Sequence, residues 1–175
     1  PAVAAAPPAT TMMVVSELPR PEFLVEIEAF GVATPSSADW KISKQAGTAE
    51  AAASVTAGRL VYLSAFDGGD PDNGAMPGEV DRQVGAALDR ARSALEGAGS
   101  SMDKIIKTTM MLTRLGDYPA MRRAETEYYE KHAPALLTQP PASTSSNWKP
   151  CRAPTRGFNL MQRRRFKPVP FSLNQ

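Results

Sequence analysis

Few residues in this sequence could carry out chemistry, and a carboxylate is the strongest candidate among them. There is one histidine, His132, and one cysteine, Cys151, so a zinc site with three or four ligands is not expected and no cofactor is indicated. Glu26 alternates with apolar residues in the run 23–32. A carboxylate in such surroundings can serve as a general acid or base. A solvent-facing glutamate on a strand is the alternative that stays open.

Four other residues could bind a substrate. Ser64 ends a predicted strand, where its hydroxyl could bind a ligand or simply satisfy the backbone. Arg122 lies in a predicted helix, where it could hold a carboxylate by paired hydrogen bonds or remain a solvated surface arginine. Phe66 and Met110 would supply apolar walls, since methionine adapts to hydrophobic ligands. His132 falls in the last turn of the same helix, where a cation suits the helix dipole.

The elements that would position these residues follow from hydrophobic periodicity. Apolar residues alternate in the predicted strands and recur every three or four residues in the predicted helices. Asp117 can cap the second helix and Pro119 suits its first turn. The order of strand, strand, strand, helix, strand, helix predicts an α+β domain with both helices on one face of a sheet. The strands are expected at 11–15, 23–32, 59–65 and 105–112, and the helices at 80–98 and 117–133.

Composition indicates one globular domain. The chain has 175 residues, of which 42% are apolar and 22% charged, and no run is long enough to span a membrane. A single cysteine fits a reducing cytoplasm, and the Ala/Pro-rich N-terminus lacks the basic start of a secretion signal.

The C-terminal region is basic. From Lys149 onward there are seven Lys and Arg residues and no Asp or Glu. Such a run can bind nucleic acid or an anionic lipid surface, but no binding fold accompanies it, so a nucleic-acid partner is not the favoured interpretation. With six prolines after 138 and no sustained periodicity, residues 146–175 are expected to form an extended arm beside a domain at 1–145.

Several short runs together resemble the RidA/YjgF family. They are Gly-Arg-Leu-Val-Tyr-Leu-Ser at 58–64, Asp-Lys-Ile-Ile-Lys-Thr-Thr at 103–109, Leu-Gly-Asp-Tyr at 115–118, and Pro-Pro-Ala-Ser-Thr at 140–144. The resemblance implies a chorismate mutase-like fold, with a single sheet and two helices packed on one face. It also implies a homotrimer with substrate clefts between its subunits, and chemistry on small molecules without a cofactor.

The order of the motifs departs from that family. The run Leu-Pro-Arg-Pro at 18–21, followed by Val-Glu-Ile-Glu-Ala at 25–29, looks like the family's closing hairpin, yet it comes first. Pro-Pro-Ala-Thr-Thr at 7–11 precedes it and repeats the run at 140–144. We interpret the front segment as the end of an upstream repeat. A displaced hairpin at 11–33 would then close the sheet of a main body at 58–145, through a connector at 34–57, as in a circular permutation.

The resemblance also bears on the site. Family members that hydrolyse imines hold the substrate carboxylate with an arginine in the Pro-Ala-Arg strand, but Thr10 and Ser143 occupy the two matching positions here. Ala51 replaces a family tyrosine, and Arg122 falls near a family asparagine. Glu26 matches the glutamate of the family's final strand.

Four functions are therefore open. We expect first a divergent RidA-like enzyme that acts on a small, largely apolar metabolite, with Glu26 as the acid/base group of a lyase, isomerase or hydrolase. An imine or enamine deaminase is the second, and the missing arginine counts against it. The third is a non-catalytic ligand-binding trimer, and the fourth an RNA-associated protein that uses the basic arm.

Overall fold

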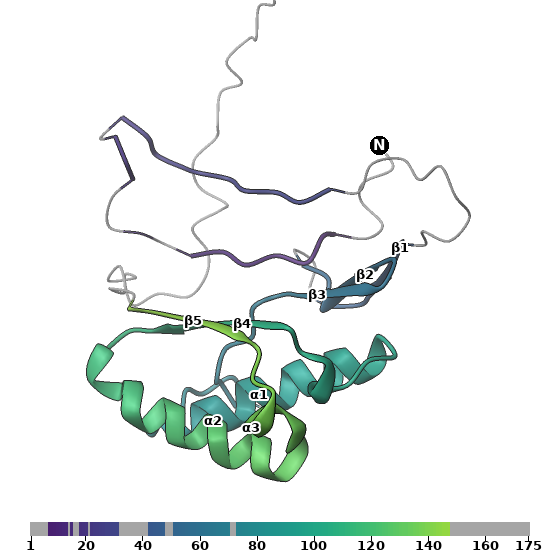
Figure 1. Ribbon diagram of the computed structural model, residues 1–175. Coiled ribbons are helices and arrows are strands. Elements are labelled where there is room, and N and C mark those ends of the chain that lie inside the picture. The colour runs from purple at the N-terminus through teal and green to yellow at the C-terminus, as the bar shows by residue number, and fades with distance from the viewer. Residues whose placement is uncertain are drawn as a thin grey trace, which may run out of the picture.

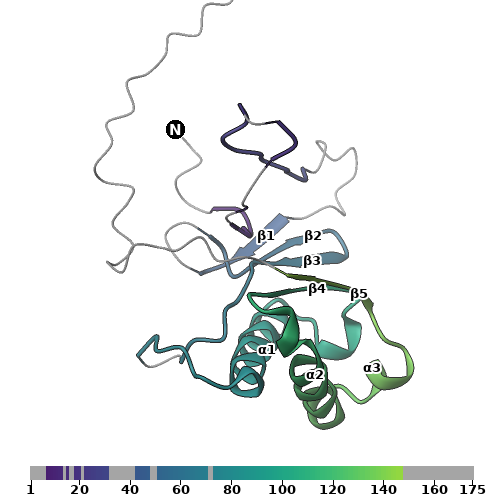
Figure 2. The same cartoon turned by 90° about the vertical axis from the view of Figure 1, so that its left-hand side faces the viewer.

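The strands and helices of the chain form separate layers. The computed structural model describes residues 7–13, 15, 18–20, 22–31, 42–47, 51–70 and 73–147. Figures 1 and 2 both show the helices on one side of the strands. The elements are β1 (Ile42–Gln45), β2 (Ser54–Ala57), β3 (Leu60–Leu63), α1 (Val80–Gly97), β4 (Lys107–Leu112), α2 (Tyr118–His132), α3 (Ala135–Thr138) and β5 (Ala142–Asn147), with 3-10 turns at Met102–Lys104 and Leu115–Asp117.

The first three strands form an antiparallel sheet in the order β1-β2-β3. The hairpin between β2 and β3 is tight, because Ala57 pairs with Leu60 and leaves only Gly58 and Arg59 in the turn. Gly58 has φ +59° and no other residue of this turn has a positive φ. That combination suits a II′ turn, whose first central position favours glycine.

The other two strands form a parallel pair, which α2 connects. Ser143 lies opposite Thr108, and Ser145 lies opposite Met110. Side chains on β4 alternate between exposed and half-buried, with Thr108, Met110 and Leu112 half-buried. Ser143 and Ser145 therefore share the face of these half-buried side chains.

The core lies between the helices and the strands. α1 packs along α2, and β3 also contacts α1. The predicted helices at 80–98 and 117–133 are confirmed, because their apolar residues repeat at helical spacing and turn toward one side. The buried cluster consists of Leu95, Met102, Tyr128, Tyr129, Ala133 and Leu136, with Val61, Leu63, Leu88 and Ile105 packed against it.

The start of α2 differs in one detail from the predicted cap. Asp117 does occupy the position before the helix, and Pro119 lies in its first turn. The carboxylate of Asp117 makes no capping hydrogen bond, however. It instead accepts a hydrogen bond from Arg114 Nε at 2.8 Å.

The predicted connector at 34–57 is wrong in its second half, which contains β1 and β2. These strands have four residues each and lack an alternating apolar pattern. They are paired by their backbone ladder, and the buried Ser54 adds a side-chain hydrogen bond to Gln45 Oε1 at 3.0 Å. At the other end, β5 continues to Asn147, two residues beyond the boundary expected at 145, and residues 148–175 lie outside the described ranges.

The hairpin predicted at 11–33 does not appear as paired strands among its described residues. None of its described residues belongs to a strand, and the Phe23 N–H donates to the Arg20 carbonyl at 3.1 Å in a turn. Figure 1 shows the arms 7–13 and 22–31 running in opposite directions on the side of the strands away from the helices. Leu24 is 93% exposed and Ile27 83% exposed, so neither face of the second arm is packed. An alternating pattern stabilises a strand only when one face is buried, which explains the difference.

The expected single sheet is divided in two among the described strands. The described strands form the β1-β2-β3 sheet and the β4-β5 pair, and no ladder joins β3 to β4. The α+β class and the placement of the helices on one face are nonetheless as predicted. No helix within the described ranges is long and apolar enough to cross a membrane.

Candidate functional site

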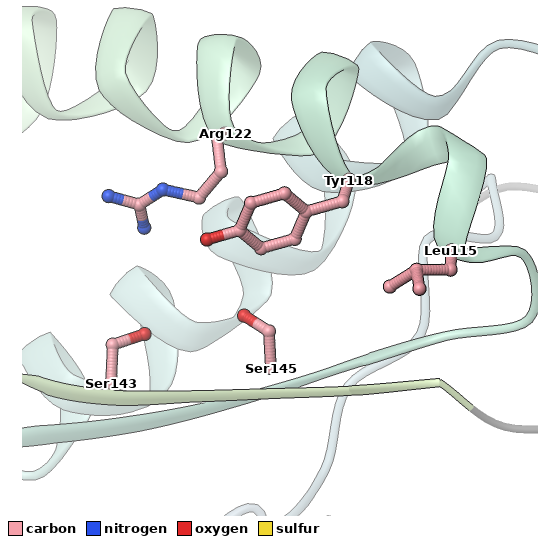
Figure 3. A pocket seen from close by; sticks show the side chains of 5 residues that line it. All are labelled: Leu115, Tyr118, Arg122, Ser143 and Ser145. Carbon is pink, nitrogen blue, oxygen red and sulfur yellow. The ribbon is translucent and has the colours of Figure 1, made fainter.

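A cleft of about 440 Å³ lies between α2 and β5. Figure 3 shows side chains from both walls pointing into it. Tyr118 and Arg122 are four residues apart on α2 and therefore share one face of the helix. The cleft is lined by Leu115, Tyr118, Arg122, Ser143 and Ser145.

The cleft exists because the side chains of β5 that face α2 are small. Ser143 and Ser145 are two residues apart and point to the helix side, where larger side chains would fill the gap against α2. Thr108 lies beside Ser143 on β4, and its buried hydroxyl has no hydrogen-bond partner among the described residues. The β5 side of the cleft therefore carries the two serine hydroxyls, with the buried Thr108 hydroxyl beside them on β4.

A buried carboxylate orients Arg122. Glu125 lies one turn further along α2 with a side chain only 2% exposed, and its Oε2 accepts a hydrogen bond from Arg122 Nη1. Its other oxygen accepts a hydrogen bond from the Tyr129 hydroxyl at 3.0 Å. Burial, reinforced by the charge of Glu125, raises the pKa of Tyr129, so this hydroxyl stays protonated as a donor. The carboxylate is thus held from two sides, and it fixes the guanidinium in turn.

The arrangement suits a small carboxylate. The Arg122 side chain is 44% exposed, and Figure 3 shows its guanidinium reaching over Ser143 beside the Tyr118 hydroxyl. A guanidinium and several hydroxyl donors at one place can bind both oxygens of a planar anion. No group of three or more potential metal ligands occurs in the described part of the chain.

Ser64 lies at a different place, and its hydroxyl serves the backbone. It donates to the Ala52 carbonyl at 2.5 Å and accepts from the Thr10 N–H at 2.9 Å. The structure thus brings Ser64 together with Thr10, the front position where the resemblance expects an arginine. Ala51, at the place of the family tyrosine, adjoins this contact through Ala52.

The remaining predicted residues are separated. Met110 is half-buried on β4 and lies next to Ser145, close to the cleft. Phe66 is half-buried in the segment after β3. Glu26 is exposed on the arm 22–31, which Figures 1 and 2 place on the side of the strands opposite α2. Glu26 and Arg122 are therefore not brought together.

Sequence reasoning missed four residues of the site. Tyr118, Leu115 and Ser145 were not singled out, and Glu125 was not recognised as the partner of Arg122. One signal was available, because an arginine and a glutamate three residues apart on a helix are neighbours on its surface. The burial of Glu125 could not be read from this spacing.

The comparisons with known proteins match this fold. Residues 45–149 fit the model of the family described as Endoribonuclease L-PSP. The chain belongs to this family, that of the RidA/YjgF proteins. The family assignment inferred from the motifs is thereby confirmed, whereas the circular permutation stays a prediction.

This chain matches only part of the length of its curated relatives. The chain is 35% identical over 82 residues to the RutC family protein UK114 of Drosophila melanogaster, which is 46% of this chain and 59% of that protein. It is 29% identical over 82 residues to the 2-iminobutanoate/2-iminopropanoate deaminase of Rattus norvegicus, covering 46% of this chain and 60% of the rat protein. The matched stretch thus spans less than two thirds of either relative.

A solved structure agrees in fold. The YjgF gene product of E. coli superimposes with a TM-score of 0.54 at 23% identity, covering 61% of this chain and 80% of that one. E. coli TdcF, solved with bound serine, gives a TM-score of 0.53 at 21% identity and covers the same shares of the two chains.

Proposed function

We propose that this RidA/YjgF-family chain acts on a small molecule whose carboxylate is held by Arg122 in the cleft between α2 and β5. One observation carries the proposal: Arg122, aligned by the buried Glu125, shares the cleft with Ser143, the position where the family has its carboxylate-binding arginine. The cation lost from the strand is supplied by the facing helix. The hydroxyl-rich lining favours a carboxylate over the largely apolar metabolite expected from the sequence.

The reaction that fits this ligand best is hydrolysis of a 2-imino acid. The rat relative is named a 2-iminobutanoate/2-iminopropanoate deaminase, and both compounds carry a carboxylate beside the imine carbon. In such a hydrolysis water adds to the imine carbon, the carbon–nitrogen bond breaks, ammonia leaves and a 2-oxo acid remains. The objection from the missing strand arginine is weaker once Arg122 is seen in the cleft. A lyase or isomerase acting on a related acid is the less favoured enzyme class.

Glu26 stays our proposed acid/base residue, and a homotrimer our proposed assembly, on the family resemblance alone. For Glu26 to act, the arm 22–31 must pack against a cleft. The exposed apolar residues of that arm, Leu24, Ile27 and Phe30, support its packing on a surface that the single chain does not provide.

A non-catalytic carboxylate-binding protein is the second candidate. It is favoured by the absence of an accessible base in the cleft among the residues that the structure describes. Glu125 is the nearest carboxylate, but it is buried and bonded to both Arg122 and Tyr129. Turnover separates the two candidates, since a binding protein would retain the ligand without converting it.

Replacement of Arg122 tests the proposal. Arg122→Gln should weaken binding of 2-oxobutanoate, the stable product, by roughly 10- to 100-fold, because a hydrogen bond to a charged group contributes about 1.5–3 kcal/mol. Titration calorimetry measures the affinity. Coupling to an amino-acid oxidase that generates 2-iminobutanoate measures turnover.

The neighbouring arginine is the matched control. Arg123 is exposed on α2 and its side chain makes no hydrogen bond or ion pair within the described structure, so Arg123→Gln should leave the affinity unchanged. Arg122→Lys should fall between the two, since it keeps the charge and loses the planar fork. Equal affinity of Arg122→Gln, Arg123→Gln and the unchanged protein would remove Arg122 from the site.

A further inference from the structure

The hydroxyl group of Tyr118 differs from those of the other two tyrosines on α2. Tyr128 donates to Asp89 at 2.7 Å and Tyr129 donates to Glu125 at 3.0 Å, so both phenols are tied to carboxylates. Tyr118 is 40% exposed, and its hydroxyl makes no hydrogen bond with any described residue. A tyrosine that packs its ring against protein usually directs its hydroxyl to a partner. The partner of this hydroxyl therefore comes from the solvent or from a bound molecule.

The start of α2 directs the Tyr118 side chain into the cleft. Tyr118 is the first residue of the helix, and its backbone is fixed between the 3-10 turn at Leu115–Asp117 and the ring of Pro119. Figure 3 shows the phenol ring extending along the cleft, with its hydroxyl turned toward the Arg122 guanidinium and lying over Ser145. A carboxylate on that guanidinium would thus leave the rest of a small ligand beside the Tyr118 hydroxyl.

Among the described residues that line the cleft, Tyr118 is the one that can readily give up a proton and take it back. Arg122 is never deprotonated in a protein, and a serine hydroxyl is a far weaker acid than a phenol. Leu115 has no polar side-chain group, and Glu125 is buried with both oxygens bonded. Tyrosine is among the side chains that act as general acids. The neighbouring guanidinium is placed to stabilise the negative charge that develops on the phenol oxygen.

We propose that the Tyr118 hydroxyl donates a proton to the nitrogen of a 2-imino acid while Arg122 holds its carboxylate. The proposal rests on the function proposed above and adds an acid to it, since Glu26 is the proposed base toward water. As the oxygen of water bonds to the imine carbon, the π electron pair of the carbon–nitrogen double bond moves to nitrogen. The nitrogen takes the Tyr118 proton, and Glu26 takes one proton of the water.

The second half of the reaction restores both side chains. The carbinolamine carries a hydroxyl and an amino group on the former imine carbon. Its hydroxyl proton passes to the Tyr118 phenolate as the carbon–oxygen double bond forms, and the electron pair of the carbon–nitrogen bond leaves with nitrogen. The departing amino group takes the proton that Glu26 received and leaves as ammonia. The water is thereby consumed, and the phenol and the carboxylate are regenerated.

Removal of one oxygen atom tests the role of Tyr118. Tyr118→Phe keeps the ring that lines the cleft, and the lost hydroxyl has no partner among the described residues, so the free energy of unfolding should not change. The maximal rate of 2-iminobutanoate hydrolysis should fall by roughly 100-fold, the lower end of general acid catalysis. Affinity for 2-oxobutanoate should fall by no more than about 5-fold, the share of one neutral hydrogen bond. The amino-acid oxidase coupling measures the rate, and titration calorimetry measures the affinity.

Tyr62→Phe is the matched control. Tyr62 is 44% exposed, nearly as much as Tyr118, but it lies on β3 outside the cleft, so this variant should keep its turnover and its affinity. Equal turnover of Tyr118→Phe and Tyr62→Phe would overturn the inference and leave the role of Arg122 intact. A fall in affinity as large as the fall in rate would also overturn it, because the hydroxyl would then only bind. Absence of turnover in the unchanged chain would refute the proposed hydrolysis itself, and its acid with it.

A double variant connects the hydroxyl to the ligand that Arg122 holds. In the Arg122→Gln background the imine is no longer aligned, so Tyr118→Phe should lower the rate there by less than about 10-fold, against roughly 100-fold in the unchanged chain. An equal fall in both backgrounds would mean that Tyr118 acts on a ligand that Arg122 does not hold, and it would overturn the proposed arrangement.

Discussion

Tyr128 joins the two long helices through a polar contact at the edge of the core, because its ring is buried while Asp89 and Arg92 are partly exposed. Its hydroxyl donates to Asp89 Oδ1 at 2.7 Å and accepts from Arg92 Nε at 3.2 Å. Burial and the hydrogen bond to Asp89 raise the pKa of Tyr128 to about 12. The phenol therefore keeps its proton in the folded chain at a pH where the unfolded chain would lose it.

Because of Tyr128, we predict that the free energy of unfolding falls at alkaline pH. Because the folded pKa lies above the ordinary value of 10, the contribution of Tyr128 is complete below about pH 10 and disappears as the pH rises through about 12. Urea unfolding at pH 9 and pH 11.5 should show a smaller decline for Tyr128→Phe than for the unchanged chain. Tyr62→Phe, on an exposed side chain, should decline like the unchanged chain.

For single residues, the chemical role of a side chain was easier to predict from the sequence than the side chains that surround it in the fold. Arg122 was recognised as a possible carboxylate ligand, but its site depends on the burial of Glu125 and on the small side chains of β5. Both come from the tertiary packing of α2 over β5, which local spacing does not contain. Ser64 was named as a possible substrate ligand, with a backbone role as the alternative, and its two hydrogen bonds to the backbone agree with the alternative.

Among the elements, α1 also fixes the loop that precedes it. Arg90 Nη1 donates to the Asp67 carbonyl at 2.6 Å and to its carboxylate at 2.7 Å, while Nη2 donates to the Gly69 carbonyl at 2.7 Å. The buried Gly68 between them lies so close to α1 that a Cβ there would be 2.4 Å from Gln83 Cβ and 2.5 Å from its Cα. Only glycine fits this approach.

Alanine in place of Gly68, before α1, and of Gly85, within α1, should therefore change the free energy of unfolding in opposite directions. Gly68→Ala should lower the free energy of unfolding by about 1–3 kcal/mol, because the α1 backbone cannot move away from the new methyl group. Gly85→Ala, inside α1 with nothing within 4 Å of its Cβ, should raise stability by up to about 1 kcal/mol. Urea unfolding at pH 7 measures both, and a stable Gly68→Ala variant would contradict the close packing.

The helices and strands also show where hydrophobic periodicity predicts secondary structure correctly. α1 and α2 were predicted closely because each carries a long amphipathic repeat. β1 and β2 were missed because each has only four residues and lacks an alternating apolar pattern. The strand predicted at 23–32 is the opposite case. The arm 22–31 has the alternating pattern of a strand, but it lacks a surface against which to pack.

For the whole molecule, the two sheets and the exposed arm decide whether Glu26 can act. We predict that Glu26→Gln lowers turnover of 2-iminobutanoate by at least 10-fold and leaves 2-oxobutanoate affinity unchanged, because an amide cannot transfer protons as a carboxylate does. Glu28→Gln, two residues along the same arm, is the control and should retain turnover. Full activity of Glu26→Gln would exclude Glu26 from the reaction.

One consequence follows from the position of Ser143 in β5. Its side chain faces the cleft, while its backbone groups turn away from β4, because the N–H of the preceding Ala142 donates to the Ile106 carbonyl. A small molecule at the cleft and a neighbouring subunit of the proposed trimer at that edge would thus share a single residue. Whatever free energy the first event adds to the second, the second must return to the first. Measured ligand affinity should accordingly vary with protein concentration.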